Sequence, residues 1–290
     1  MTHPASGEAG ALSGAIPLRA LVDTLPAPAR RALRGARAAA ARLRFRPYVT
    51  QVHLLGVPYR FLIADRSAQG WYTNPAQNAN PHLRWLVERL VRTGDVVLHC
   101  GAHHGLLTLP LAARVGPEGR VYCVEPHRRN AGIIRRNARM NGMANVQVLV
   151  RVIAGCAGPV RVLSGSHNSL AGGDGGHPTH AARASTLDGL LAEFGIRPTV
   201  VLLDLGGLEV VALRASPVLR AMEPRMAIEV HPADVRRHGA EPNSLFELLP
   251  PAARLFAQPA SGAAPVGPVT PATAPDVQYE LYVLPAGGED

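Results

Sequence analysis

Hydrophobic and polar residues follow two different patterns along this chain. Between residues 49 and 64, apolar and polar residues alternate around a turn at Gly56-Val57-Pro58, which predicts a β-hairpin. From His82 onward, short apolar runs alternate with segments of helical periodicity. This second pattern is typical of βαβ units, so we predict an α/β fold with helices on both faces of a mostly parallel sheet.

The same pattern places the individual elements. Expected strands occupy residues 95–100, 120–125, 146–153, 159–163, 199–205, 225–231 and 277–284, the last as an antiparallel edge strand. Expected helices occupy residues 82–92, 104–115, 130–141, 185–194, 208–222 and 243–249, with Ser185 or Thr186 as the cap of the fourth. A Gly-rich segment at 164–180 and a Pro/Ala-rich segment at 259–276 are expected to be flexible loops.

Three regions result from these boundaries. We predict a disordered tail over residues 1–27, then a basic helix, the hairpin and a lead-in helix over 28–92, and one main domain over 93–290. Up to Arg46 there are eight arginines and two acidic residues, so much of the net charge of +9 lies there. A solvated helix face explains these arginines, and an arm that contacts phosphate or lipid is the alternative.

Composition narrows the class of protein. Hydrophobic residues make up 47% of the 290 positions but aromatic residues only 4%, so Ala, Val and Leu must fill the core. Three cysteines without a CxxC pair exclude a disulfide scaffold and favour a reducing cytoplasm. Because no apolar run approaches the length of about 18 residues that a membrane helix needs, we predict no transmembrane segment and no secretion signal.

Two glycines follow the first strand of the main domain. Gly101 and Gly105 can adopt backbone angles closed to other residues, and a helix expected to begin beside them would direct free N–H groups at an anion. The segment lacks the GxGxxG spacing of dinucleotide-binding proteins. Taken alone, it fits a purely structural strand-to-helix turn equally well.

Glu125 ends the second strand, 24 positions after Gly101. This spacing is close to the roughly 20 residues at which a carboxylate meets a ribose in nucleotide-binding folds. A carboxylate can accept from both ribose hydroxyls at once. The alternative is a carboxylate that only complements the N-terminus of the next helix.

Further candidate side chains follow the fourth and fifth strands, where open α/β sheets bind ligands. Asp204 ends the fourth strand among apolar residues. Glu229 and His231 lie on one side of the fifth strand at a period of two. His231 has the ordinary pKa of a proton acceptor near neutral pH, and a structural role is the alternative.

Several blocks together resemble a known family. They are Gly101-Ala102 with Gly105, Glu125-Pro126 with Asn137, Ser185-Thr186-Leu187-Asp188, Leu203-Asp204-Leu205 with Gly207 and Glu209, and Glu229. Their order is similar to that of the FkbM-type S-adenosylmethionine-dependent methyltransferases, over residues 93–231. The resemblance implies a seven-stranded Rossmann-like sheet and transfer of a methyl group from S-adenosyl-L-methionine to a hydroxyl of a sugar or secondary metabolite.

The resemblance also assigns roles to residues. For the cofactor it implies His99, Gly101, Ala102 and Gly105 at the methionine end, Glu125 and Pro126 at the ribose, and Ala154 and Cys156 beside the adenine. Asp204 and His231 are the candidate catalytic bases, and Asn168, Ser169 and Glu229 are the candidate substrate-binding residues. We expect the loop around Asn168 and Ser169 to close over a small-molecule acceptor.

Departures from the family pattern keep a second hypothesis open. His99, His103, Leu202 and Gly206 stand where the family has Asp, Asn, Lys and Glu. A catalytically degenerate binding or assembly module is therefore the alternative function. A nucleic-acid partner is disfavoured by the scarcity of aromatic residues for base stacking. No metal site is expected, because a tight turn should splay the rings of His99, His103 and His104.

Overall fold

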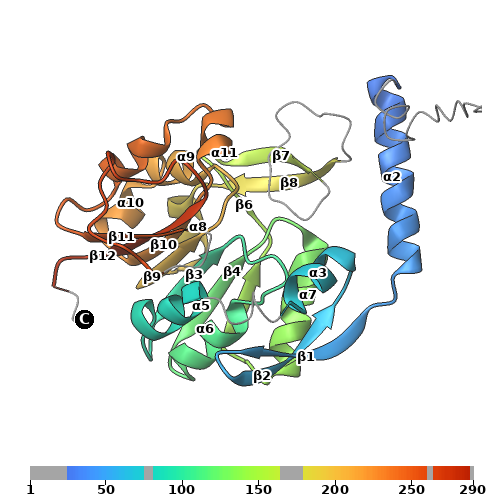
Figure 1. The fold of residues 1–290 in the computed structure, drawn as a ribbon, viewed down its shortest axis with the longest axis horizontal. Coiled ribbons are helices and arrows are strands. Elements are labelled where there is room, and N and C mark those ends of the chain that lie inside the picture. Colours follow the sequence, from blue (N-terminus) through green and yellow to red (C-terminus); the bar gives the residue numbers. More distant parts are fainter. Residues whose placement is uncertain (1–24, 75–80, 164–178, 260–263, 288–290) are drawn as a thin grey trace, which may run out of the picture.

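The main body of the chain is a seven-stranded sheet between two layers of helices (Figure 1). The computed structural model describes residues 25–74, 81–163, 179–259 and 264–287. In spatial order the strands are β11 (Arg254–Pro259), β12 (Tyr279–Leu284), β10 (Arg225–Val230), β9 (Val200–Leu203), β3 (Val96–Cys100), β4 (Arg120–Val124) and β5 (Val146–Leu149). Neighbouring strands run parallel across β10, β9, β3, β4 and β5, and β12 is antiparallel to both of its neighbours. The predicted α/β class and seven-stranded Rossmann-like sheet are confirmed.

Chain order reverses direction in the middle of this sheet. The chain adds β4 and β5 on one side of β3 and then returns to place β9 and β10 on the other side. The carboxyl ends of β3 and β9 therefore lie side by side with their connections leaving in opposite directions. Such a reversal opens a crevice above the sheet, where α/β proteins bind ligands.

Helices flank both faces of the sheet. In the described part of the chain they are α2 (Ala27–Arg44), α3 (Arg66–Tyr72), α5 (Pro81–Trp85), the π-helix η1 (Leu86–Leu90), α6 (Thr108–Val115), α7 (Arg128–Met140), α8 (Leu187–Phe194), α9 (Glu209–Arg214), α10 (Pro217–Ala221), α11 (Pro232–Arg237) and the 3₁₀ helix η2 (Pro242–Leu248). The hairpin of β1 (Tyr48–Leu54) and β2 (Val57–Ile63) packs on α7. α2 stands apart from these layers (Figure 1). No helix among the described residues is long and apolar enough to cross a bilayer.

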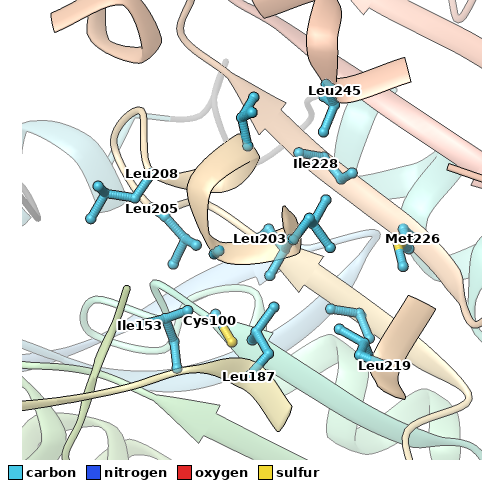
Figure 2. Packing of buried hydrophobic residues seen from close by; sticks show 14 of the residues in the cluster. Cys100, Ile153, Leu187, Leu203, Leu205, Leu208, Leu219, Met226, Ile228 and Leu245 are labelled. Atoms are coloured by element: carbon cyan, nitrogen blue, oxygen red, sulfur yellow. The ribbon is translucent and has the colours of Figure 1, made fainter. Parts of the chain in front are cut away.

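Alternation along the strands creates two apolar layers. In β9, Val201 and Leu203 face one layer, which α8 to α11 and η2 cover, while Val200 and Leu202 face the other, which the hairpin, η1 and α6 cover. Figure 2 shows part of the first layer, in which Cys100 of β3 lies beside Leu187 and Ile228 of β10 lies beside Leu245. Each fully buried Leu or Ile stabilises the fold by roughly 1.5–3 kcal/mol, so the two layers together supply much of the stability that holds the strands in place.

Three strands were missing from the pattern or were placed wrongly. No strand was predicted at β11, and because β11 pairs with β12 the last strand is antiparallel but is not an edge strand. The strand expected over 146–153 splits into β5 and β6 (Val152–Ile153), which leaves the main sheet to pair with β8 (Thr179–Ser185). β8 also pairs with β7 (Gly158–Leu163), which was predicted. The small residues of β8 hide its alternation, since Ala and Ser carry little hydrophobic contrast.

Helix limits also differ from the prediction. Pro217 lacks the N–H that would continue a helix, so the segment expected as one helix forms α9 and α10. α6 begins at Thr108 rather than at residue 104, because residues 101–107 form successive turns. α3 was not predicted, although Asp65 caps it by accepting from the Ala68 N–H at 2.9 Å. Thr186, one of two proposed caps, does cap α8.

An ion pair holds together the amino ends of three strands. The Asp95 carboxylate accepts from the Arg225 guanidinium at 2.6 Å, from the Thr199 hydroxyl at 2.7 Å and from the Arg92 N–H at 2.6 Å. The Asp95 and Arg225 side chains are only 8% and 14% exposed. Every carboxylate oxygen thus has a partner, which is the condition under which a buried charge is tolerated.

We expect Asp95→Ala to lower the free energy of unfolding by about 3–5 kcal/mol, because it leaves the Arg225 charge buried without a counterion. Urea denaturation measures this change. Glu88→Ala is the matched control, since the Arg84–Glu88 pair is exposed and its loss costs less than about 1 kcal/mol. Equal effects of the two substitutions would contradict the structural role of Asp95.

Candidate active site

The turn after β3 packs directly against the end of β9. Gly101 has a φ of +92°, and a Cβ at this position would lie 2.0 Å from the backbone oxygen of Asp204. The Gly101 N–H donates to the Val124 oxygen at 3.0 Å, and the Asp204 N–H donates to the Cys100 oxygen at 3.0 Å. Only glycine satisfies both the backbone angle and this close approach. Gly101 therefore brings the ends of β3, β4 and β9 together.

A cavity of about 210 Å³ lies at these strand ends. Its lining residues are Trp71, Tyr72, His82, His99, Gly101, Ala102, His103, Leu106, Leu107, Leu202, Leu203, Asp204, Ala227, Glu229 and Glu280. They come from α3, α5, β3 and the turn after it, β9 and β10 with the ends of these strands, and strand β12. The structure thus brings His99, Gly101, Ala102, Asp204 and Glu229 together, as the sequence predicted for a single site.

Other predicted site residues lie elsewhere. Glu125, Ala154 and Cys156 are not among the described residues that line this cavity. Ala154 is buried in the small three-stranded sheet, and Cys156 is exposed beside it. Asn168 and Ser169 fall outside the described residues.

Glu125 is completely buried, and its carboxylate is bound by the protein itself. Oε2 accepts from the His103 N–H at 3.0 Å, while Oε1 accepts from the His127 N–H at 2.9 Å and from Asn130 at 3.3 Å. Burial raises the pKa of Glu125 to about 7, and these hydrogen bonds offset part of that rise. The residue fastens the turn after β3 to the start of α7, so a ribose can reach it only if residues 103 and 104 move. Contact with ribose stays a prediction.

Imidazole rings surround the same turn. His103 and His104 stack with ring centroids 4.1 Å apart, which corrects the expectation that these rings splay. The Tyr72 hydroxyl is hydrogen-bonded to His103 Nδ1. His103 also has a φ of +49°, an uncommon backbone angle for a non-glycine residue. In this structure the turn is held by Tyr72 on one side and Glu125 on the other.

His99 lies on β3 beneath the cavity. Its side chain is 4% exposed, and Nδ1 has no hydrogen-bond partner among the described residues. Burial lowers the pKa of His99 to about 4, so the ring is neutral at physiological pH. A buried imidazole without a partner is costly, and a ligand group that donates to Nδ1 would remove that cost.

The opposite wall of the cavity is acidic. Burial and the charges of Glu229 and Glu209 raise the pKa of Asp204 well above its ordinary value. His231 lies beyond Glu229, with 3.3 Å between His231 Nε2 and Glu229 Oε1. Its hydrogen bond to Glu229 raises the pKa of His231 to about 9. This hydrogen bond favours the protonated ring, and a role for His231 as a proton acceptor stays a prediction.

Sequence reasoning missed part of the wall. Trp71, Tyr72 and His82 precede the main domain, and Glu280 belongs to the final strand. Glu280 is an acid inside the otherwise apolar run of β12, and its pKa is raised well above the ordinary value by burial and by neighbouring carboxylates. The adjacent aromatics at 71 and 72, in a chain with 4% aromatic residues, were the available signal for the other side.

Among known proteins, similarity to this chain was found only in solved structures. Neither a family model nor a curated protein sequence matches the chain. TrmN from Thermus thermophilus is 18% identical, with a TM-score of 0.39, over 70% of this chain and 46% of that one. The T. thermophilus 16S rRNA N2 G1207 methyltransferase RsmC, in complex with AdoMet and guanosine, is 19% identical, with a TM-score of 0.47, over 83% and 51%.

A third similar structure is the O-methyltransferase from Bacillus cereus in complex with SAH, 15% identical with a TM-score of 0.43 over 76% of this chain and 86% of that one. This chain spans about half the length of TrmN and of RsmC. All three identities are below 20% and all three TM-scores are below 0.5. Functional inference therefore rests on the residues of this chain.

We expect the Glu125 carboxyl to make folding pH-dependent. In the unfolded chain it loses its proton near pH 4.5, but in the folded protein near pH 7, so stability falls as pH rises through this window. Glu125→Gln should remove that decline, changing the difference in unfolding free energy between variant and wild type by about 3 kcal/mol across the window.

Denaturation curves collected at several pH values test this expectation. Glu118→Gln is the matched control, because Glu118 is exposed and its removal should leave the pH dependence as in the wild type. Parallel curves for wild type and Glu125→Gln would show that Glu125 titrates normally in the folded protein.

Proposed function

We propose that this protein is an S-adenosyl-L-methionine-dependent methyltransferase of FkbM type that O-methylates a hydroxyl of a sugar or secondary metabolite. One observation carries the proposal: the cavity lies where the strand order reverses, with Gly101 after β3 and Asp204 after β9 in backbone contact. This is the position at which open α/β sheets bind nucleotide-like ligands. The order of the sequence blocks supports the same function.

The residues around the cavity suit this cofactor. S-adenosylmethionine supplies an activated methyl group on a positively charged sulfur. Carboxylates of Asp204, Glu229 and Glu280 face the same space and favour a cation there. Nδ1 of His99, which has no hydrogen-bond partner among the residues that the structure describes, offers an acceptor suited to the amino group of the methionine end. Gly101 and Ala102 present small surfaces beside it.

The rest of the cofactor is assigned by resemblance. Gly105 belongs to the methionine end, Glu125 and Pro126 would hold the ribose, and Ala154 and Cys156 would flank the adenine. Because Glu125 is enclosed by backbone donors, this assignment requires the 103–104 turn to open when the cofactor binds. Such opening would exchange the His103 N–H for a ribose hydroxyl at the Glu125 carboxylate.

Asp204 is the residue placed to accept the proton of the acceptor hydroxyl. It lines the cavity, and none of the described residues forms a side-chain hydrogen bond with it. Trp71 and Tyr72 form an aromatic wall on the cavity, which excludes water from the reacting atoms. Methyl transfer then needs the hydroxyl oxygen and the methyl carbon to be held in line, which a closed cavity achieves by orientation.

The acceptor is a small molecule in this proposal. The chain contains 30 arginines and no lysine, yet no arginine is among the described residues that line the cavity. Phosphate-rich substrates require cationic side chains along their path. An acidic cavity therefore disfavours nucleic acid as the acceptor.

A non-catalytic binding module is the second candidate, and the enclosed carboxylate of Glu125 favours it. If the turn cannot open, the fold keeps the crevice but loses the ribose contact. Calorimetric titration with S-adenosylmethionine and with S-adenosylhomocysteine separates the two functions. We expect saturable binding of both, and no binding at millimolar concentration would favour the module.

Substitutions then test the assigned roles. Glu125→Ala should weaken cofactor binding at least tenfold, because the ribose hydroxyls lose their acceptor. Asp204→Asn should retain cofactor binding but lower transfer of labelled methyl to a panel of methyl glycosides by about 10²–10⁴-fold. Glu118→Ala is the control for both measurements. Unchanged binding in Glu125→Ala, or unchanged transfer in Asp204→Asn, would remove that residue from the site.

A further inference from the structure

Three ligand-type side chains converge at the acidic wall of the cavity. Asp204 follows β9, Glu229 belongs to β10 and His231 follows β10, and one side-chain atom of each lies within 4.8 Å of the others. All three side chains are partly exposed, so the atoms are accessible. Asp204 and Glu229 also line the cavity itself.

The spacing of these atoms suits a metal ion. Two ligands about 2.1 Å from one cation lie roughly 3.0 Å apart at an octahedral angle and roughly 3.4 Å apart at a tetrahedral one. His231 Nε2 and Glu229 Oε1 are already 3.3 Å apart. One oxygen of Asp204 lies within 4.8 Å of a ligand atom of each, so a shift of this side chain toward them would complete the set.

Neighbouring groups hold the ligands in orientation. His231 Nδ1 lies 4.0 Å from an Asp234 oxygen on α11, which places a carboxylate behind the ring. Gln278 donates to Glu229. Histidine ligands in metal sites commonly have a carboxylate on the nitrogen that faces away from the ion.

Several carboxyl groups lie close together here. Glu229 is directly opposite Glu280 across the β10–β12 pair, an arrangement of like charges that destabilises a sheet. Glu209 lies nearby with no exposed surface, and its Oε2 has no partner among the described residues. His82 and His231 lie beside these acids, and because Glu229 favours the protonated form of His231, a metal ion must displace the proton from His231 Nε2.

We propose that Asp204, Glu229 and His231 bind a divalent cation such as Mn²⁺ or Zn²⁺. Two carboxylates and one imidazole suit these ions, and three protein ligands leave coordination positions open toward the cavity. The role of the ion rests on the proposed function. The open positions would bind the oxygen of the methyl acceptor, and the ion would lower the pKa of that hydroxyl group. Asp204 would bind through one oxygen and keep the other for the hydroxyl proton.

Metal binding is measured on the full-length, untagged chain after treatment with EDTA. We expect titration with Mn²⁺, followed by the loss of the free-ion paramagnetic resonance signal, to give one saturable site. Asp204→Asn and His231→Gln should each weaken binding at least tenfold. His238→Gln, at the end of the same helix α11 and outside the cluster, should bind as the wild type does.

Each outcome decides the proposal. Absence of saturable binding of both Mn²⁺ and Zn²⁺ to the wild type overturns it, as does binding that survives the Asp204→Asn and His231→Gln substitutions together. His231 is at the protein surface, so His231→Gln keeps the test decisive if Asp204→Asn does not fold, as judged by circular dichroism. Cofactor titration of the EDTA-treated wild type is run alongside, because its failure bears on the methyltransferase proposal and not on the metal site.

Discussion

The close approach of Gly101 to the backbone of Asp204 is the constraint on which the site depends. Because no side chain fits between them, the ends of β3 and β9 meet without a spacer, and whatever follows each strand must share one small volume. An acidic side chain in that volume cannot be buried in an apolar core, so it turns into the cavity. The chemistry of the site is thus a consequence of a steric requirement at one glycine.

Packing on both faces of the sheet maintains this contact. The two apolar layers fix the strands laterally, and the Asp95–Arg225 pair fixes their amino ends. With the strands held at one end and along their length, the opposite ends can carry groups that are unfavourable for folding. Glu125 and the opposed pair of Glu229 and Glu280 are such groups, and their cost is borne by the stability of the rest of the sheet.

Much of this architecture was predictable from sequence, for identifiable reasons. The parallel strands are nearly continuous apolar runs, as is usual for strands covered on both faces, and of the residues predicted to share one site Gly101, Asp204 and Glu229 line one cavity while Glu125 does not. β8 and β11 were not predicted because small residues and proline weaken the alternation of apolar and polar positions in these strands. The contacts of Glu125 were beyond prediction, since the same carboxylate serves a ribose or two backbone N–H groups equally well.

One wall of the cavity belongs to the last strand of the sheet. β12 contributes Glu280, and the Tyr282 hydroxyl is 2.5 Å from Nδ1 of His82, a residue 200 positions earlier. A nascent chain on the ribosome therefore has the glycine turn, the aromatic wall and Asp204 long before the pocket is finished. The complete cavity can therefore form only once β12, the last strand to be synthesised among those that line it, has joined the sheet.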